Sequence, residues 1–328
     1  MLLTPFSLFP FFAFMGMIYY LTSMIDYQTR IEQIRKQLPD LRYEQFSEAL
    51  SGTHHKVFLS EHFVIRFRDD NNNLLRREAE LLKQLDHHLI PTTVLETEYD
   101  HLPAIVENRL PGSTMNSVWK DLSCNTQNDI TKELVDFIKY LRNQPKDFVY
   151  SVVTGKEYNT FLELLTDSLE EKLGEIQKIK KAGQILKDIQ ELLEDKRIQT
   201  LFSNTENITL NHGDLIIHNI LTDGNHITGI LDWELALFGD LDYDLCRLFY
   251  YKECAQAYQN EGVDDTFESD YMNRVAEEIQ KQNLIENKEL FQEKYTFIRA
   301  IFFLNALHWA ARSKDPQKNT AELIARWK

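Results

Sequence analysis

The chain of 328 residues carries 36 lysine and arginine residues against 51 aspartate and glutamate residues, which gives a formal net charge of −15. Nonspecific nucleic-acid binding relies on cationic contacts to phosphates, so this balance argues against a nucleic-acid partner. The charge would favour a cationic ligand in a focused cleft, but acidic surfaces also serve solubility alone, and composition leaves both interpretations open.

The length exceeds the roughly 100 to 200 residues of a typical domain, which predicts two domains. The three cysteines, Cys124, Cys246 and Cys254, show no metal-binding spacing, and an odd count argues against structural disulfides. We therefore expect the protein in the reducing cytoplasm.

Residues 1–23 are uncharged and rich in aromatic side chains. About 20 apolar residues can span a bilayer, so one interpretation is a membrane anchor. The stretch lacks the basic segment and the small-residue cleavage site of a signal peptide. The other interpretation is that translation starts at Met24, where a polar helix begins. We favour this second interpretation and keep residues 1–23 outside the fold.

Two β-prone runs follow, at residues 56–59 and 63–67, and the polar turn between them predicts a hairpin. Arg66 and Arg68 alternate along the second run, so they would project from the same face of the strand. Either Arg66 or Arg68 could therefore be the cationic residue that this strand places on that face.

Helical spacing of apolar residues predicts a helix over residues 74–85. Glu78 lies on or beside its buried face, although periodicity alone does not separate it from Glu80. Further helices are expected at residues 130–141, 160–173, 176–201, 244–254 and 291–311.

The most informative stretch runs from His212-Gly213-Asp214 through Asn219 to Asp232-Trp233-Glu234. β-Prone runs at 219–222 and 226–231 flank the turn signal Asp223-Gly224-Asn225, which predicts a second hairpin. This hairpin would return Asp232 to the neighbourhood of Asn219.

A carboxylate, an amide oxygen and a second carboxylate in this order suit phosphoryl transfer, which needs an oriented acceptor hydroxyl and cations on the nucleotide phosphates. Asp214 would accept or orient the hydroxyl proton. Asn219 and Asp232 would be oxygen ligands of Mg²⁺, an ion that commonly takes few protein carboxylates beside phosphate oxygens.

His-Gly-Asp, four residues, Asn and then Asp-Trp-Glu resembles the motif of the aminoglycoside phosphotransferase and choline kinase family, relatives of the protein kinases. Residues 239–245 resemble the family's Gly-Asp-Pro-x-x-Asp-Leu segment, with Leu241 where proline is usual. His218 departs from the small residue common before the asparagine. The resemblance implies an α+β, bilobal protein-kinase-like fold. A small N-terminal lobe with an antiparallel sheet and a helix would span residues 24–108, and a larger, mainly helical lobe with the catalytic loop and acceptor pocket would span 109–328.

The resemblance also implies a nucleotide site in the first lobe. The loop with Ser51, Gly52 and Thr53 would cover the phosphates. Arg66, preferred over Arg68, would reach the α- and β-phosphates through its guanidinium fork. Glu78 would pair with Arg66 and orient it.

The segment 103–112 resembles the strand and connector between the lobes. Backbone groups at Glu107, Asn108 and Arg109 would meet the edge of the base. Because main-chain groups serve there, ATP and GTP remain alternatives as the donor.

Supporting and acceptor roles follow from the same resemblance. His212 and Asp240 would hold the loops in place, and Glu234 would grip an amine of the acceptor. An aminoglycoside leads the acceptor classes, and choline, ethanolamine, a sugar amine, a macrolide or an amino alcohol are alternatives. A further alternative, from another functional class, is a noncatalytic, nucleotide-binding pseudokinase. The presence of Asp214, Asn219 and Asp232 argues against it, because a noncatalytic chain has no chemical need for all three. Membrane association would depend on residues 1–23 alone.

Overall fold

The computed structural model describes residues 27–49, 56–68, 73–99, 101–178, 183–203, 207–260 and 266–313, without the side chains of 256–260 and 266–268. These residues form two compact units. Unit 1 contains the residues up to Met115 together with 152–155 and 218–234. Unit 2 contains residues 116–151, 156–217 and those from Leu235 onward.

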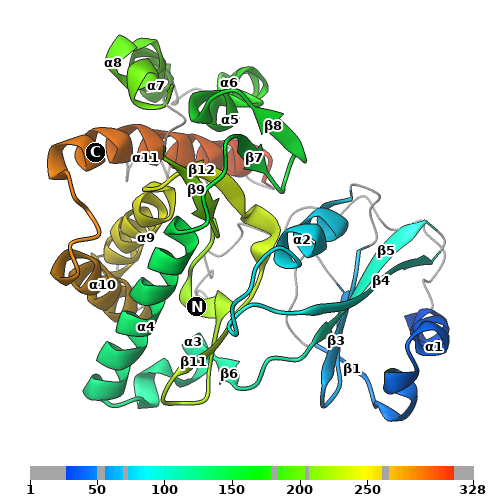
Figure 1. The fold of residues 1–328 in the computed structure, drawn as a ribbon. Helices are drawn as coiled ribbons and strands as arrows, with labels where there is room; N and C mark the ends of the chain where they lie inside the picture. Colours follow the sequence, from blue (N-terminus) through cyan, green and yellow to red (C-terminus); the bar gives the residue numbers. More distant parts are fainter. Residues whose placement is uncertain are drawn as a thin grey trace, which may run out of the picture. The chain divides into compact units, whose positions relative to one another are not determined.

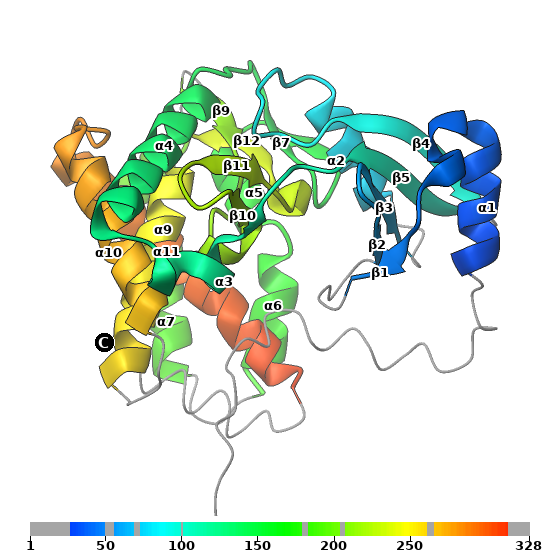
Figure 2. The same cartoon turned by 90° about the horizontal axis from the view of Figure 1, so that it is seen from below.

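Unit 1 contains a five-stranded antiparallel sheet with strand order β1-β2-β3-β5-β4. Its strands, shown in Figures 1 and 2, are β1 (Ser47–Glu48), β2 (Lys56–Leu59), β3 (Phe63–Phe67), β4 (Thr93–Tyr99) and β5 (Leu102–Asn108). β2 and β3 form the first predicted hairpin, and Arg66 of β3 lies opposite Ile105 of β5.

Helices cover both faces of this sheet because side chains alternate along a strand. Val106 of β5 packs in one cluster with α1 (Tyr27–Gln37), and its neighbour Ile105 packs with α2 (Leu74–Leu82). Residues directly opposite in an antiparallel pair share a face. Arg66 therefore lies on the face that α2 covers.

A three-stranded sheet in unit 1 joins segments that are distant in the sequence. β6 (Ser113–Thr114) pairs with β10 (Ile220–Thr222), which forms the second predicted hairpin with β11 (Ile227–Ile230). Residues 218–234 belong to unit 1, and β10 within them pairs with β6. Backbone pairing over such a separation leaves no local signal in the sequence.

Unit 2 contains a four-stranded antiparallel sheet with order β8-β7-β12-β9. These strands are β7 (Val149–Ser151), β8 (Lys156–Tyr158), β9 (Ile208–Asn211) and β12 (Leu237–Asp240). β9 leads directly into the His-Gly-Asp segment, and β12 leads into the first long helix after it. The two strands are antiparallel, so Asn211 at the end of β9 pairs with Leu237 at the start of β12, and Asp240 at the end of β12 pairs with Ile208 at the start of β9.

Most of unit 2 is helical (Figure 2). Its helices are α4 (Cys124–Arg142), α5 (Phe161–Thr166), α6 (Leu169–Ile176), α7 (Gly183–Glu194), α8 (Lys196–Leu201), α9 (Tyr243–Asn260), α10 (Thr266–Lys281) and α11 (Lys288–Ala311). α10 packs beside both α4 and α9, and α11 contributes Phe303, Leu304 and Leu307 to a core shared with α6 and α7. Short helices also occur in both units: α3 (Met115–Val118), η2 (Pro39–Tyr43), η3 (Trp119–Asp121), η4 (Ile217–Asn219) and η5 (Trp233–Leu235).

Polar side chains set the starts of several helices. Ser123 accepts a hydrogen bond from the Thr126 N–H at the start of α4, and Asn287 accepts one from Leu290 at the start of α11. Such caps satisfy backbone donors that have no partner within the helix. Asp195 caps α8 in the same way and so divides the helix expected over 176–201.

The predicted α+β organisation, with an antiparallel sheet first and a mainly helical region after it, is confirmed. The helix expected over 160–173 is broken at Ser168, whose φ of 61° lies in the left-handed region. In the part of the chain that the structure describes, no helix is long and apolar enough to cross a membrane. Residues 1–23 lie outside that part.

Candidate active site

Arg66 of unit 1 lies between two buried carboxylates. Its Nη1 and Nη2 donate to Oε1 and Oε2 of Glu78 at 2.8 and 2.7 Å, and Nη1 lies 3.7 Å from Oε1 of Glu107. Burial disfavours the guanidinium charge, but the charges of Glu78 and Glu107 outweigh it and raise the pKa of Arg66. The predicted pairing of Arg66 with Glu78 is confirmed, while Glu80 is exposed.

The side chain of Glu107 is also buried and lies beside Arg66. Glu107 is 4% exposed, and its Oε1 has no hydrogen-bond partner within the described part of the chain. Burial raises the pKa of this carboxyl to about 7, although Arg66 acts in the opposite direction. Only the backbone of Glu107 was expected to take part, and in the structure its side chain is a buried carboxyl beside Arg66.

Glu78 also contacts the segment that carries Asp232. Its Oε1 accepts a hydrogen bond from the Trp233 N–H at 3.2 Å. Asp232 itself has a φ of 66°, a left-handed conformation that is unfavourable for a non-glycine residue and is often found at functional sites. The Leu231 N–H donates to the Asn219 carbonyl at 2.8 Å, so the hairpin brings Asp232 next to Asn219 in the backbone ladder, as predicted.

The chemistry of this pair fits Mg²⁺. One carboxylate and one amide oxygen are hard ligands, and Mg²⁺ commonly needs few from the protein when nucleotide phosphates supply others. Asp232 also contributes to the raised pKa of Arg66. The expected metal carboxylate and the expected phosphate-binding cation therefore act on one another within unit 1.

The connector after β5 uses its backbone donors internally. The Asn108 N–H donates to the Thr92 carbonyl at 3.0 Å, and the Arg109 N–H donates to the His62 carbonyl at 2.8 Å. A base could use these two donors only if those bonds opened, so the carbonyl groups are the better candidates. Ser51, Gly52 and Thr53 of the expected phosphate loop lie outside the described residues.

Glu234 has a partner inside unit 1. The carboxylate is 6% exposed, and its Oε2 lies 3.5 Å from Nη1 of Arg68. An amine of an acceptor would have to compete with this guanidinium. Arg68, which was the alternative to Arg66 as the phosphate-binding cation, thus pairs with the carboxylate that was expected to bind the acceptor.

Asp214 belongs to unit 2 and is held by two residues of α9. Its Oδ1 accepts hydrogen bonds from the Tyr251 hydroxyl at 2.8 Å and from Nη2 of Arg247 at 3.1 Å. Asp214 is 3% exposed. A buried carboxylate with two strong donors on one oxygen has a defined orientation.

The backbone around Asp214 is anchored by a second carboxylate of α9. Asp244 accepts hydrogen bonds from the N–H groups of His212 and Gly213, both at 2.8 Å, and burial raises its pKa to about 6 against the effect of these donors. Nδ1 of His212 accepts from the Asp214 N–H at 3.1 Å. This contact is the kind of support expected of His212, and it requires an unprotonated Nδ1.

Gly213 is required by its backbone and its surroundings. Its φ of 80° is left-handed, and an added Cβ would lie 2.2 Å from the Leu235 carbonyl oxygen. The loop before Asp214 therefore passes too close to the chain after Trp233 for any side chain.

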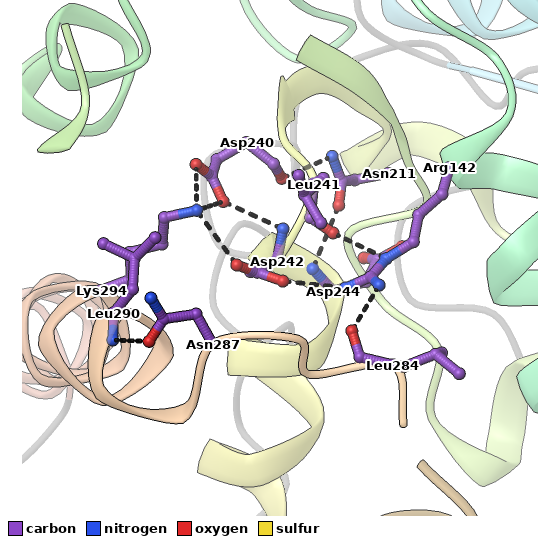
Figure 3. Close-up of polar contacts among 10 residues, drawn as sticks. All are labelled: Arg142, Asn211, Asp240, Leu241, Asp242, Asp244, Leu284, Asn287, Leu290 and Lys294. Carbon is purple, nitrogen blue, oxygen red and sulfur yellow. Dashed lines mark hydrogen bonds and ion pairs between the residues drawn. The ribbon is translucent and has the colours of Figure 1, made fainter. Parts of the chain in front are cut away.

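Asp240 lies in a buried ion-pair network, shown in Figure 3. Nζ of Lys294 contacts Oδ1 of Asp240 at 2.9 Å and Oδ2 of Asp242 at 3.0 Å, and Nη2 of Arg142 donates to Oδ1 of Asp242 at 2.9 Å. Burial disfavours the ammonium, but Asp240 and Asp242 outweigh it and raise the pKa of Lys294. The network joins the turn before α9 to α4 and α11, which agrees with a supporting position for Asp240.

Sequence reasoning missed the contacts that α9 makes. Asp244, Arg247 and Tyr251 recur at spacings of three and four residues, which places them on one helix face. Three polar residues on one face of a helix that starts at the end of the motif were the available signal. Periodicity does not show that this face meets Asp214.

Comparison with known proteins extends these observations. The model of the phosphotransferase enzyme family matches residues 45–277. Hygromycin-B 4-O-kinase of Escherichia coli is 40% identical over 41 residues, a match that spans only 12% of this chain and 12% of that protein.

Similar solved structures cover nearly the whole chain. A thermostable mutant of aminoglycoside phosphotransferase APH(4)-Ia, in a ternary complex with ADP and hygromycin B, has a TM-score of 0.63 and 15% identity over 89% of this chain and 98% of its own. ADP-bound APH(2'')-Ib has a TM-score of 0.62 and 18% identity over 90% and 96%. The gentamicin complex of APH(2'')-IIa has a TM-score of 0.63 and 17% sequence identity, and the match covers 93% of this chain and 96% of that chain.

At these identities the solved structures establish the fold, and the expected kinase-like fold is confirmed. The family model covers most of the chain, from the strands before Arg66 to α10. The matched residues include the segment from His212 to Glu234 and residues 239–245. The chain therefore belongs to the phosphotransferase enzyme family.

Proposed function

We propose that this protein is a Mg²⁺- and nucleotide-dependent phosphotransferase that phosphorylates a hydroxyl group of a small molecule. The observation that carries the proposal is the Glu78 carboxylate, which binds Arg66 with both oxygens and also accepts the N–H of Trp233, the residue after Asp232. One buried group thus joins the proposed phosphate-binding cation to the proposed metal ligand. ADP in the similar structures supports a nucleotide donor.

Each proposed role follows from the chemistry of the residue. Arg66 binds the α- and β-phosphates through its guanidinium fork, and Glu78 keeps that fork oriented. Asn219 and Asp232 hold Mg²⁺, which when bound neutralises charge on the phosphate oxygens. Asp214 orients the acceptor hydroxyl and takes its proton as the hydroxyl oxygen bonds to the γ-phosphorus and the bond to the leaving nucleoside diphosphate breaks.

The acceptor is proposed by class. Similar structures hold hygromycin B and gentamicin, which supports an aminoglycoside as the first acceptor to examine. The net charge of −15 agrees with a cationic acceptor, and choline, ethanolamine or a sugar amine share that property. Base recognition through the backbone of residues 107–109 leaves ATP and GTP as alternative donors.

A coupled assay of nucleoside diphosphate release tests the proposal. The full chain is incubated with Mg²⁺, with ATP or GTP, and with aminoglycosides, choline, ethanolamine, macrolides and sugar amines in turn. We expect stimulation by one acceptor class, reduced to a small residual rate in Asp214→Asn and retained in full in Asp136→Asn, which alters an exposed aspartate of α4. An undiminished rate in Asp214→Asn would overturn the role of Asp214. Nucleotide binding without turnover for any acceptor would favour the pseudokinase alternative.

A further inference from the structure

Oδ1 of Asp214, the Tyr251 hydroxyl and the Arg247 guanidinium are joined in pairs by hydrogen bonds and form a closed triangle. The Tyr251 hydroxyl donates to Oδ1 at 2.8 Å, and Nη2 of Arg247 donates to the same oxygen at 3.1 Å. Nη2 and Nε of Arg247 also lie 2.8 and 3.1 Å from the Tyr251 oxygen. The tyrosine therefore accepts from the guanidinium while it donates its only proton to Asp214.

The triangle is packed against aromatic rings of α9 and α11. Arg247 and Tyr251 are four residues apart on α9 and so lie on one face. The guanidinium carbon of Arg247 lies 5.4 Å from the ring centres of both Tyr251 and Phe302, the latter on α11. Burial raises the pKa of Tyr251, so its hydroxyl stays protonated at neutral pH and remains a donor.

We propose that Arg247 and Tyr251 are positioning residues for the catalytic carboxylate, which they hold through Oδ1 so that Asp214 meets the acceptor hydroxyl in one fixed orientation. The inference rests on the proposed function of Asp214. A reacting group must be held within a fraction of an ångström for efficient transfer, and charge-assisted hydrogen bonds provide such restraint. In this arrangement Arg247 acts through Asp214 and belongs to unit 2, whereas Arg66 and Glu78 belong to unit 1.

This assignment predicts a particular kinetic signature. Arg247→Ala should lower kcat by roughly 10- to 100-fold, the scale on which misplacement of a reacting group costs rate, and leave the KM for nucleotide within about twofold. Tyr251→Phe should lower kcat by about 10-fold, because it removes one hydrogen bond to a charged group. Tyr250→Phe and Arg299→Ala are matched controls. Tyr250 is the neighbouring tyrosine of α9, and Arg299 pairs with Glu253 of α9 at 2.6 Å.

Chemical rescue separates positioning from structural support. The Arg247 side chain is 14% exposed, so the space left by Arg247→Ala can be reached from solvent. Guanidinium ion at low millimolar concentration should restore part of kcat in this variant, whereas urea should not, and neither should act on Arg299→Ala. The melting temperature of every variant is recorded beside its kinetics.

A double-mutant cycle links the effect to Asp214. If Arg247 acts through Asp214, adding Arg247→Ala to Asp214→Asn should cause no further loss of kcat. Wild-type kcat in both Arg247→Ala and Tyr251→Phe would overturn the inference while leaving the role of Asp214 intact. Loss without guanidinium rescue, with additive effects in the cycle, would equally overturn it and indicate a structural role. Full activity of Asp214→Asn alone would instead refute the proposed role of Asp214, on which this inference rests. If Arg247→Ala does not fold, Tyr251→Phe and its cycle with Asp214→Asn decide the outcome.

Discussion

Replacement of Glu107 by glutamine should stabilise the protein at neutral and alkaline pH. The carboxyl is 4% exposed, its Oε1 has no hydrogen-bond partner in the described part of the chain, and burial raises its pKa to about 7. Glu107→Gln keeps the shape of the side chain and removes the need to ionise it.

The size of the effect follows from the pKa. The pKa rises from the ordinary value of 4.5 to about 7, and at roughly 1.4 kcal/mol per pKa unit this rise corresponds to a penalty of about 3 to 4 kcal/mol for ionising the buried carboxyl. Because the folded-state pKa is raised, the folded protein binds this proton more tightly than the unfolded chain. The contribution to stability is therefore present below the unfolded pKa and is lost as the pH rises through about 7. The stability of Glu107→Gln relative to wild type should rise by about 2 to 3 kcal/mol between pH 5 and pH 8.

The measurement is unfolding by urea, followed by tryptophan fluorescence and by circular dichroism at pH 5, 6, 7 and 8. Coincident transitions from the two probes justify comparing free energies. Glu80→Gln is the control, since it makes the same chemical change at an exposed position of α2. If Glu107→Gln and Glu80→Gln show the same offset from wild type at every pH, the reasoning from burial to a raised pKa is refuted.

Three further predictions concern the candidate site. Glu78→Ala frees Arg66 from its two-point contact, and kcat/KM for the nucleotide should fall by about 10- to 100-fold in steady-state kinetics; an unchanged value would show that Arg66 needs no orientation. Gly213→Ala brings a Cβ to 2.2 Å from the Leu235 oxygen, so a thermal melt should show a loss of about 1 to 3 kcal/mol or more, and a wild-type melting temperature would contradict the close approach. Burial raises the pKa of Asp244 to about 6, so kcat should decline as the pH falls through about 6, when protonation weakens its bonds to the loop amides. Asp244→Asn should show a low rate without that inflection, and persistence of the inflection would assign it to another group.

Much of the fold and part of the site could be predicted because their signals are local. The hairpin at 56–67 and the hairpin at 219–231 each consist of two β-prone runs around a polar turn, and both form. Helical spacing predicted α2, and the side-chain pairing of Arg66 with Glu78 followed from a resemblance in which a strand and the next helix carry these residues. Short connections leave few alternative arrangements, so local patterns were sufficient here.

Local patterns and motif spacing were sufficient to predict the two hairpins and α2, and the family motifs identified the oxygen and cationic groups available for phosphoryl transfer. Only the packed fold shows that Tyr251 and Arg247 hold Asp214 and that Asp244 binds the loop amides. The same holds for the side chain of Glu107, which lies inward beside Arg66. Periodicity identifies the face of an element that is buried, but not the distant element that covers it. Asp214 meets its partners across more than 30 residues of chain, and only the packed fold specifies contacts over that separation.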